Sequence, residues 1–424
     1  MKINVESHSG SILRVSGPAS VRVLDGRVHI LGRVLGAGES VIISMYKSYP
    51  LQFIESSRIE VELGSGGYVE NPREEDEVLP EWIKTAQEII DKNSRIIVVG
   101  PVESGKSSLT TLLANTAIAR GLKTCVIDAD IGQQDIGPPG FISMTCPREP
   151  FVWLRDLMPE HIRIVGSLTP SQYSSRLVSG VMDLVGEAVL KGAEVVIINT
   201  DGWISSPQAL EMKLEMARYV RARYILALQK GYYLGGLTSS LEGLRIIPLP
   251  SPQGVRVRSR EDRRALRSQA YRKFFEGASQ RTLEIAQGLI IVGSCLASGE
   301  KLSQDKISEL GKALGLNILY GSKYENSVYL YVQAQDKSLG ERILKYQDLE
   351  VQIIPQGSER GLLASLLDPS MREVAPAILE SLDLLSGILK IVTRYNGPVA
   401  GVVIGRIKID SLYDDSVRYS RCPI

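Results

Sequence analysis

The chain has 424 residues, and its 49 Lys and Arg against 48 Asp and Glu leave a net charge of +1. This balance excludes a protein that attracts a polyanion through its overall charge, so any nucleic-acid site has to be a local patch. The length allows two to four domains. Hydrophobic residues make up 44% of the chain, as in ordinary globular proteins, and no apolar run approaches the roughly 20 residues of a membrane span.

The four cysteines lie far apart and form no C-x-x-C pair. This spacing predicts neither a disulfide framework nor a zinc site, and it favours a reducing compartment. The segment from Met1 to Glu6 lacks the apolar region of a secretory signal. We therefore expect a cytoplasmic protein without a membrane segment. The cysteines are Cys125, Cys146, Cys295 and Cys422.

Residues 1–78 predict a small β-sandwich or barrel-like domain with no catalytic constellation. Asp25-Gly26 lies between two alternating runs and predicts a two-residue hairpin. Glycines at 64, 66 and 67 and the acidic stretch from Glu70 to Glu77 mark the end of the domain. The expected strands are Ser11–Val15, Val21–Leu24, Arg27–Leu31, Val41–Ser44 and Arg58–Leu63.

Residues 79–284 alternate between strand and helix patterns, which predicts an α/β domain with a parallel sheet covered on both faces. Ligands bind such sheets at the carboxyl ends of the strands. The expected strands are Ile96–Val99, Thr124–Ile127, Ile162–Val165, Val195–Ile198, Tyr224–Leu228 and Leu244–Ile247. The expected helices include Pro80–Lys92, Lys106–Arg120, Ser171–Lys191 and Pro207–Arg221.

A glycine-rich loop follows the first of these strands and fits G-x-x-x-x-G-K-[ST], the pattern of a phosphate-binding P-loop. Lys106 would bridge the β- and γ-phosphates, and the Ser107 hydroxyl would ligate Mg²⁺. The alternative is a chance match, but strand, loop and helix occur in the required order. The expected nucleotide-binding residues are Gly100, Pro101, Val102, Glu103, Ser104, Gly105, Lys106, Ser107 and Ser108.

Asp128-Ala129-Asp130-Ile131-Gly132-Gln133 follows the second strand. Carboxylates at a strand end near a P-loop can hold Mg²⁺ or orient a nucleophile. If the strand continues, Asp128 and Asp130 point to the same side, since side chains alternate. We expect both to be metal ligands, while the alternative is that they cap a turn.

A third polar segment, Asn199-Thr200-Asp201-Gly202-Trp203, follows the buried strand Val195–Ile198. It falls at a carboxyl end of the predicted sheet. Trp203 would pack on a base or on the P-loop, or else it is a core residue that closes the edge of the sheet. Position alone does not separate these two interpretations.

A basic segment between Arg256 and Lys273 carries seven arginines against Glu261 and Asp262. Arg260, Arg264 and Arg267 recur at i, i+4 and i+7, so a helix would place them on one face. One interpretation is a lid that closes over transferring phosphate and a polyanion. The other is a solvated basic helix.

Residues 285–424 predict a mixed, mostly β domain that carries no motif tied to chemistry. One segment, Met371–Ser381, is compatible with a helix. The expected strands are Gly288–Gly293, Asn326–Gln333, Val351–Ile354 and Val399–Ile409.

The four motifs, in this order, resemble the polynucleotide 5′-hydroxyl kinases, the RNA kinases found with the pre-mRNA cleavage factor, the tRNA-splicing machinery and pre-rRNA processing. The resemblance covers nearly the whole chain, whose compact form is similar to archaeal members. It implies ATP and Mg²⁺ as cofactors and RNA or DNA 5′-hydroxyl ends as substrates. RNA-processing proteins are the partners it implies.

The resemblance also implies roles for individual residues. Asp130 matches the base that activates the 5′-hydroxyl, and Arg258 and Arg263 match the catalytic lid arginines, in a register uncertain by a few positions. Thr200 and Trp203 match a clasp that contacts substrate and supports the P-loop. Segment 166–170 matches one near the substrate 5′ end. The expected substrate-binding residues are Gln133, Thr169, Thr200, Trp203, Arg260 and Arg264.

The sequence thus predicts an ATP-dependent kinase that transfers the γ-phosphate to the 5′-hydroxyl of RNA, DNA or both. The alternative is an ATP-binding scaffold of an RNA-processing complex that holds nucleotide without using it. A GTPase is disfavoured, because the chain has no Asn-Lys-x-Asp or Thr-Lys-x-Asp motif for guanine.

Overall fold

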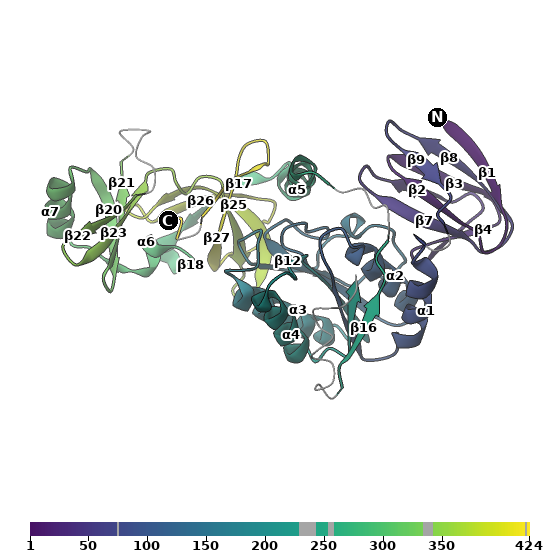
Figure 1. Cartoon of the computed structure of the whole chain (residues 1–424). Helices are drawn as coiled ribbons and strands as arrows, with labels where there is room; N and C mark the ends of the chain where they lie inside the picture. The colour runs from purple at the N-terminus through teal and green to yellow at the C-terminus, as the bar shows by residue number, and fades with distance from the viewer. Residues whose placement is uncertain (74–75, 229–242, 253–257, 334–341, 420–421) are drawn as a thin grey trace. The chain divides into compact units, whose positions relative to one another are not determined.

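The computed structural model describes residues 1–73, 76–228, 243–252, 258–333, 342–419 and 422–424 (Figure 1). They form two compact units, and the division falls within one helix, after Arg263. The first unit holds 1–137, 142–160 and 170–263, and the second holds 138–141, 161–169 and 264–424. Three independently folding domains with boundaries at 78 and 284 remain a proposal.

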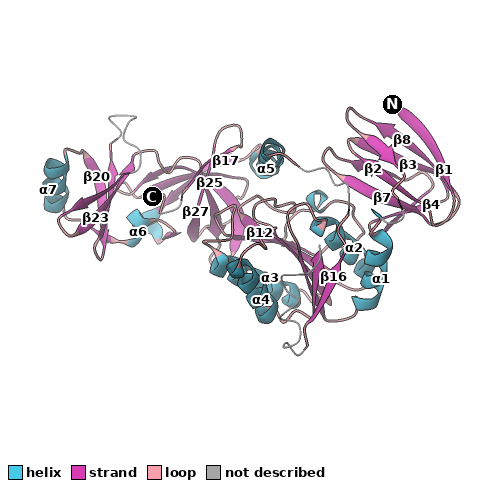
Figure 2. Cartoon of the chain, viewed as in Figure 1, coloured by secondary structure: helices cyan, strands magenta, loops and turns pink. Residues whose placement is uncertain are grey.

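The N-terminal part of the first unit is a sandwich of two antiparallel sheets, as the sequence predicts (Figure 2). One has the order β1-β8-β3-β6 and the other β5-β4-β7-β2-β9. Their inner faces bury alternate apolar residues. The strands are β1 (Lys2–Ser7), β2 (Ile12–Ser16), β3 (Ala19–Asp25), β4 (Arg27–Ile30), β5 (Arg33–Gly36), β6 (Ser40–Ile43), β7 (Ser48–Phe53), β8 (Ser57–Leu63) and β9 (Tyr68–Glu70).

The hairpin predicted at Asp25-Gly26 is wrong. β3 pairs with β6 and β8, whereas β4 pairs with β5 and β7 in the other sheet. The chain therefore crosses between the two layers at Gly26. The tight turn lies one strand later, where Leu31 and Gly32, both with positive φ, join β4 to β5. A Gly with positive φ serves either connection, so local sequence does not choose between them.

This sandwich and the P-loop part share one continuous hydrophobic core. At their junction the Asn115 side chain donates hydrogen bonds to the backbone oxygens of Leu31 and Phe151, each at 2.7 Å. Asn115 lies on α2 (Lys106–Ala119), the helix that begins at the P-loop lysine. The β4–β5 turn is therefore tied to the helix that carries the site.

The central sheet has the order β13-β12-β11-β14-β10-β15-β16. The pairs between β11, β14, β10, β15 and β16 are parallel, as predicted. β12, which the sequence did not reveal, pairs antiparallel with β11. The strands are β10 (Ser94–Val99), β11 (Thr124–Ala129), β12 (Phe141–Thr145), β13 (His161–Ile164), β14 (Val195–Thr200), β15 (Tyr224–Leu228) and β16 (Arg245–Leu249).

Helices cover both faces of the parallel strands, with α1 and α2 on one side and α3 and α4 on the other (Figure 1). α2 packs on β10, β11 and β14, and α3 packs on β11 and on α4. None of the described helices is long and apolar enough to cross a membrane. The remaining bounds are α1 (Leu79–Ile89), α3 (Ser174–Leu190) and α4 (Pro207–Tyr219).

All four cysteines are paired, which overturns the expectation of no disulfides. Val126 of β11 pairs with Thr145 of β12, so this antiparallel register brings Cys125 beside Cys146. The second bond joins Cys295 to Cys422, 127 positions apart. Sequence spacing shows neither pair, because tertiary pairing makes both. The argument from cysteines to a reducing compartment therefore loses its basis.

The second unit is mostly β, as predicted. One sheet has the order β17-β26-β25-β24-β27-β18 with β28 beside β27, and the other β19-β20-β21-β23-β22. The strands are β17 (Ser279–Glu284), β18 (Ile290–Val292), β19 (Glu300–Lys301), β20 (Ile318–Tyr324), β21 (Ser327–Val332), β22 (Arg342–Tyr346), β23 (Leu349–Pro355), β24 (Leu362–Leu367), β25 (Glu373–Asp383), β26 (Ile388–Thr393), β27 (Gly401–Ile409) and β28 (Asp415–Arg418). The helices are α5 (Arg260–Phe275), α6 (Cys295–Ser298) and α7 (Gln304–Leu314), beside short 3₁₀ turns.

The helix expected at Met371–Ser381 is wrong, because these residues belong to strand β25. Ala, Leu and Glu suit a helix, but Ala375, Ala377 and Leu379 are buried at every second position. That period is the period of a strand with one buried face. Pairing with β24 and β26 therefore overrides the local helix preference.

Two arginines of α5 anchor this helix to the start of β28 and the residue before it. Arg267 makes a two-pronged ion pair with Asp415, with N–O distances of 2.9 and 3.3 Å and side chains only 12% and 4% exposed. Arg264 pairs with Asp414 at 3.3 Å. One face of the predicted basic helix thus makes contacts within the second unit.

We expect Asp415→Asn to destabilise the second unit by about 3–5 kcal/mol, because it leaves the buried guanidinium of Arg267 without its charge partner. All three tryptophans lie in the first unit, so amide hydrogen exchange across α5 and β27 is the suitable measurement. Glu309→Gln removes the exposed pair with Lys306 and should change little. Equal exchange in both variants would contradict the anchoring role.

Candidate active site

The P-loop joins β10 to α2 at the carboxyl edge of the parallel strands. Gly105 has φ +93°, and a Cβ there would lie 2.8 Å from the ring of Trp82. The Trp82 indole N–H donates to the backbone oxygen of Pro250 at 2.9 Å, which holds the ring in place. A glycine is therefore required both by backbone conformation and by space.

The Lys106 side chain lies under the loop, where its ammonium donates to the backbone oxygens of Gly100 and Pro101 at 3.0 and 2.7 Å. Burial lowers the pKa of Lys106 to about 8, against the opposing charges of Asp130 and Asp201. Only 6% of the lysine is exposed. Its ammonium group carries hydrogen-bond donors that suit phosphate oxygens.

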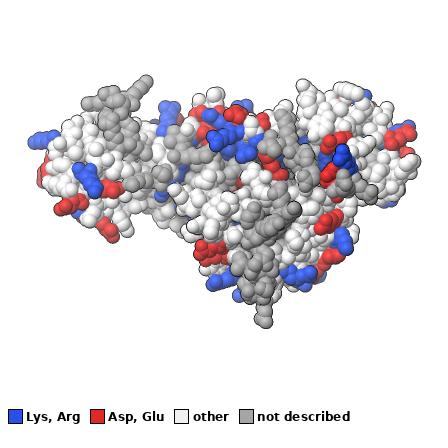
Figure 3. Space-filling view, in the orientation of Figure 1, with Lys and Arg blue, Asp and Glu red and all other residues white. Residues whose placement is uncertain are grey.

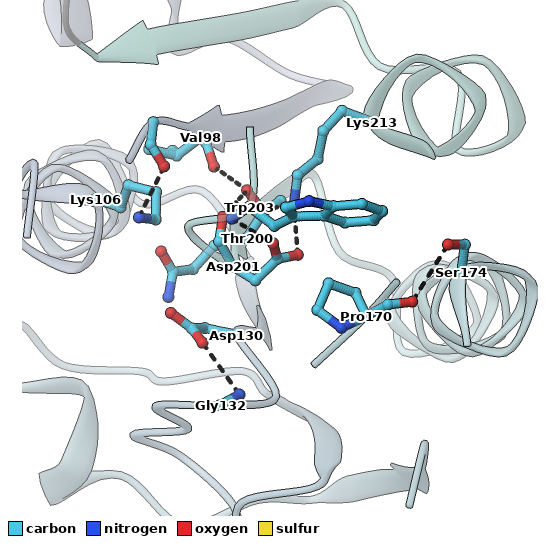
Figure 4. A network of polar contacts seen from close by, with 12 residues as sticks. Val98, Lys106, Asp130, Gly132, Pro170, Ser174, Thr200, Asp201, Trp203 and Lys213 are labelled. Carbon is cyan, nitrogen blue, oxygen red and sulfur yellow. Dashed lines mark hydrogen bonds and ion pairs between the residues drawn. The ribbon is translucent and has the colours of Figure 1, made fainter. Parts of the chain in front are cut away.

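Asp130 follows β11 and lines the same cavity as Lys106 and Ser107. Its Oδ1 accepts hydrogen bonds from the backbone N–H groups of Gly132 and Gln133, at 3.2 and 3.0 Å (Figure 4). Among the described residues these bonds use Oδ1 alone, so Oδ2 remains available to a ligand. Burial raises the pKa of Asp130, and the charge of Lys106 opposes the rise. A carboxylate with a raised pKa is suited to accept a proton near neutral pH.

Asp128 is placed differently from Asp130, because β11 ends at Ala129 and the chain then turns. Its Oδ1 accepts from the Asn199 amide at 2.9 Å, and its Oδ2 accepts from the Asp135 N–H at 2.8 Å. Burial, and then the charges of Asp135 and Asp130, raises the pKa of Asp128 to about 7. Asp128 therefore shapes the loop from beneath, and these contacts give no support to its expected role as a metal ligand.

The cavity contains oxygen donors that suit Mg²⁺. Ser107 and Asp130 both line it, and Mg²⁺ is usually held by one or two such groups together with substrate phosphates and water. The described residues contain no group of three or more acidic, His or Cys side chains arranged to hold a metal. The residues present thus fit a metal that arrives with a nucleotide better than a resident one.

The loop after β14 is tied to the P-loop by two contacts. The Thr200 hydroxyl donates to the Val98 oxygen of β10 at 2.8 Å, and a Cβ on Gly202 would lie 2.5 Å from a methyl group of Val102. The Asp201 carboxylate accepts the backbone N–H of Trp203 at 2.8 Å. Trp203 itself is only partly buried, so it does not fill the core as the alternative interpretation required.

Sequence reasoning missed Lys213, which lies at the centre of this region (Figure 4). Its ammonium is 2.5 Å from Asp201 Oδ2, and the two side chains are 1% and 6% exposed. The available signal was a lysine on the apolar face of α4, four positions after Ala209 and three before Met216, both buried.

Arg258 and Arg263, the two expected lid arginines, both line the cavity and both contact Glu103 of the P-loop. The Glu103 carboxylate accepts the Arg258 backbone N–H at 2.9 Å and lies 3.7 Å from the Arg263 guanidinium. Arg263 also donates to the Arg258 oxygen. Glu103 therefore joins the P-loop to the start of the lid.

The other predicted substrate residues are distributed as follows. Gln133 lines the cavity, Arg260 is exposed at the start of α5, and Arg256 lies outside the described residues. Arg264 is engaged by Asp414 in the second unit, which does not support its expected substrate contact. Thr169 is exposed and also belongs to the second unit.

The N-terminal sandwich forms part of the cavity wall, although its sequence shows no catalytic constellation. Lys47 is the central residue of this wall. It pairs with Asp135 at 3.6 Å and lies over the Trp153 ring at 4.8 Å. Burial lowers the pKa of Lys47 to about 8. The other residues of the sandwich that line the cavity are Arg14, Ser16, Gly17, Tyr46, Ser48, Tyr49, Gly66 and Tyr68.

The charge of this cavity is positive, although the chain as a whole is nearly neutral. On the face seen in Figure 3, basic and acidic side chains are interspersed. Inside the cavity five cationic side chains face three carboxylates, and such a local excess attracts polyphosphate and nucleic acid. The cations are Arg14, Lys47, Lys106, Arg258 and Arg263, and the carboxylates are Glu103, Asp130 and Asp135.

Comparison with known proteins adds independent findings. Residues 100–277 match the family model described as the P-loop of mRNA cleavage and polyadenylation factor CLP1. A polyribonucleotide 5′-hydroxyl-kinase of Pyrococcus abyssi is 30% identical over 329 residues, which cover 76% of this chain and 89% of that protein. One from Thermococcus kodakarensis is 32% identical and covers 77% and 92%. The Clp1p–Pcf11p complex contains a similar fold, with TM-score 0.63 and 13% identity over 96% of this chain and 98% of that chain.

We expect nucleotide affinity to fall as the pH rises through about 8, because deprotonation of Lys106 removes a positive charge that faces phosphate. The measurement is a binding titration of ATP between about pH 6 and pH 10, roughly two units on either side of this pKa. Lys106→Arg should flatten the fall, since guanidinium stays charged. Lys47→Arg is the control for Lys106→Arg, because Lys47 lines the same cavity and also has a pKa of about 8. If Lys106 is the group responsible, the fall in affinity should persist in Lys47→Arg. An affinity that stays constant in the unmodified protein would contradict the assignment.

We expect Gly202→Ala to reduce phosphoryl transfer by about 10²-fold, because the added methyl group displaces Val102 and the P-loop with it. Gly186→Ala in α3 is the control, since no atom lies within 4 Å of the added carbon and Ala favours a helix. Initial rates at saturating nucleotide would measure the difference. Equal rates would show that the loop contact is not needed.

Proposed function

This chain belongs to the polyribonucleotide 5′-hydroxyl kinase family, and we propose that it uses the cavity above the P-loop to phosphorylate RNA 5′ ends. As a member of that family the chain is an ATP-dependent phosphotransferase. The parts that we propose are the roles of individual residues, the site's use of Mg²⁺ and the preference for RNA over DNA.

One observation supports the proposal more than any other. A P-loop lysine, a carboxylate with a raised pKa and two arginines line a single cavity, although they come from three separate segments of sequence. A protein that only binds nucleotide needs the lysine, but it has no use for a proton acceptor beside the phosphates. The set Lys106, Asp130, Arg258 and Arg263 therefore favours transfer onto a hydroxyl over simple binding.

In the mechanism that we propose, Asp130 Oδ2 accepts the proton of the 5′-hydroxyl as its oxygen bonds to the γ-phosphorus. The bond from that phosphorus to the β-γ bridging oxygen breaks, and ADP leaves. Lys106 and Arg263 neutralise the charge on the phosphate oxygens. When the nucleotide is bound, Mg²⁺ would supply further neutralisation, held by the Ser107 hydroxyl together with phosphate oxygens, which leaves Asp130 Oδ2 for the proton. Glu103 holds the lid arginines near the P-loop.

On the acceptor side, Trp203 and Gln133 are the side chains that we propose for contact with the RNA end. Trp203 is partly exposed next to the loop that contacts Val102, and aromatic rings stack with bases irrespective of sequence. Contact with RNA-processing proteins is a further part of the proposal that rests on the sequence resemblance. The cytoplasmic location expected from the sequence stays a proposal, and the two disulfides remove the cysteine argument for it.

The kinase test supplies labelled ATP with matched oligonucleotides that end in a 5′-hydroxyl or a 5′-phosphate, each as RNA and as DNA. We expect transfer only to the 5′-hydroxyl ends, with RNA preferred. Binding of ATP without transfer to either end would support the scaffold alternative. Equal rates on RNA and DNA would contradict the proposed preference while leaving the kinase intact.

Two variants test the residue assignments in the same assay. Lys106→Ala should abolish transfer, and Asp130→Asn should lower kcat by about 10²–10⁴-fold, the contribution typical of a general base. Asp305→Asn, at an exposed position of α7 outside the cavity, is the control and should leave kcat unchanged. An Asp130→Asn enzyme with normal kcat would show that another group accepts the proton.

A further inference from the structure

Lys213 is a buried charge that the mechanism above does not use. Its side chain is 1% exposed, with the ammonium 2.5 Å from Asp201 Oδ2 and 3.5 Å from the Asp201 backbone oxygen. The neighbouring residues on the same face of α4 are the apolar Met212 and Met216. A buried ion pair can often be replaced as a whole by apolar residues without loss of stability, so the stability of the fold alone does not explain why this pair is present.

The partner of Lys213 is the residue that organises the loop after β14. One oxygen of the Asp201 carboxylate meets Lys213, and the other accepts the Trp203 N–H at 2.8 Å. Gly202, between these two residues, lies against Val102 of the P-loop. The position of Asp201 therefore sets both the direction of Trp203 and the surface on which the P-loop rests.

Asp201 is also close enough to act on Lys106. The charges of Asp201 and Lys213 both influence the P-loop lysine, in opposite directions. Without Lys213, Asp201 would be a buried carboxylate that has lost its ion-pair partner, beside a P-loop lysine that its charge already influences. Unpaired buried charges reorganise to find a partner. An ion pair between Asp201 and Lys106 would compete with the phosphates for the lysine.

We propose that Lys213 is a positioning residue for phosphoryl transfer: it holds Asp201 so that the 200–203 loop supports the P-loop and Lys106 stays available to phosphate. This inference rests on the proposed function, since its main readout is transfer to a 5′-hydroxyl. The inference has two parts, the support of the P-loop by the 200–203 loop and the availability of Lys106 to phosphate. The two can be measured separately, through the order of the loop and through the effect of the Asp201 charge.

The test compares Lys213→Met with the double variant Lys213→Met/Asp201→Asn in the full chain. We expect the single variant to lose about 10–100-fold in kcat and to weaken ATP binding, because Asp201 is left to pair with Lys106. The double variant has no unpaired carboxylate and should recover to within about threefold of the unmodified kcat. Lys191→Met removes a half-exposed pair with Glu160 elsewhere in the same unit and should leave kcat unchanged.

Hydrogen exchange gives a readout that a merely structural lysine would not produce. In Lys213→Met the Trp203 N–H should exchange faster, because its acceptor has turned away, while amides of β10 and β14 stay protected. Lys213→Arg, which keeps the charge, should retain slow exchange and most of the activity. This variant keeps the test decisive if Lys213→Met does not fold.

Two results would overturn the inference: an unchanged kcat in Lys213→Met, or a double variant no more active than the single one. A chain that binds ATP but transfers nothing in unmodified form would instead contradict the proposed function. In that case ATP affinity and Trp203 exchange still decide whether Lys213 positions the loop.

Discussion

The parallel register of β11, β14 and β10 is the constraint on which the site depends. Asn199 of β14 is the strand partner of both Val98 and Asp128, so the three strands end at the same level. The P-loop, the Asp130 loop and the Asp201 loop follow these ends and must therefore meet. The hydrogen bonds from Thr200 to Val98 and from Asn199 to Asp128 join the ends of these strands, from which the loops begin. None of these three loops forms the site alone, because the site needs the residues of all three side by side.

Bringing these loops together also brings charged side chains together away from water, which costs free energy. Lys106, Asp201 and Lys213 are buried, and the partly buried Asp130 faces the same cavity as Lys106. Each charge would be costly alone, but opposite signs alternate, so the group is tolerated as a set. Burial lowers the pKa of the P-loop lysine and raises that of the carboxylate, which brings both towards neutral pH. Burying these charges lowers the stability of the fold, but the same desolvation shifts the two pKa values to a range that suits proton and phosphoryl transfer.

The helix α5 links this site to the rest of the chain. Arg263 belongs to the first unit, with Glu103 as its partner, whereas Arg264 and Arg267 are held by Asp414 and Asp415 in the second unit. The sequence showed one basic segment with a shared face and predicted one role for it. In the structure, Arg263 contacts the P-loop whereas Arg264 and Arg267 anchor the helix, because their acidic partners lie about 150 positions away in sequence. The lid role itself stays a prediction.

The sequence by itself determined the P-loop, the two further motifs at strand ends and most strands of the sandwich and of the central sheet, but only four of the twelve described strands from β17 to β28. These features have local signals, since glycine spacing and runs of apolar residues reflect backbone geometry over a few positions. Only the tertiary structure decided what depends on distant partners: the layer crossing at Gly26, the strand at 373–383, both disulfides and the cavity wall from the N-terminal sandwich. It also separated Asp130 from Asp128 and revealed Lys213. The physical reason is that register, burial and charge pairing are set by residues that lie far away along the chain.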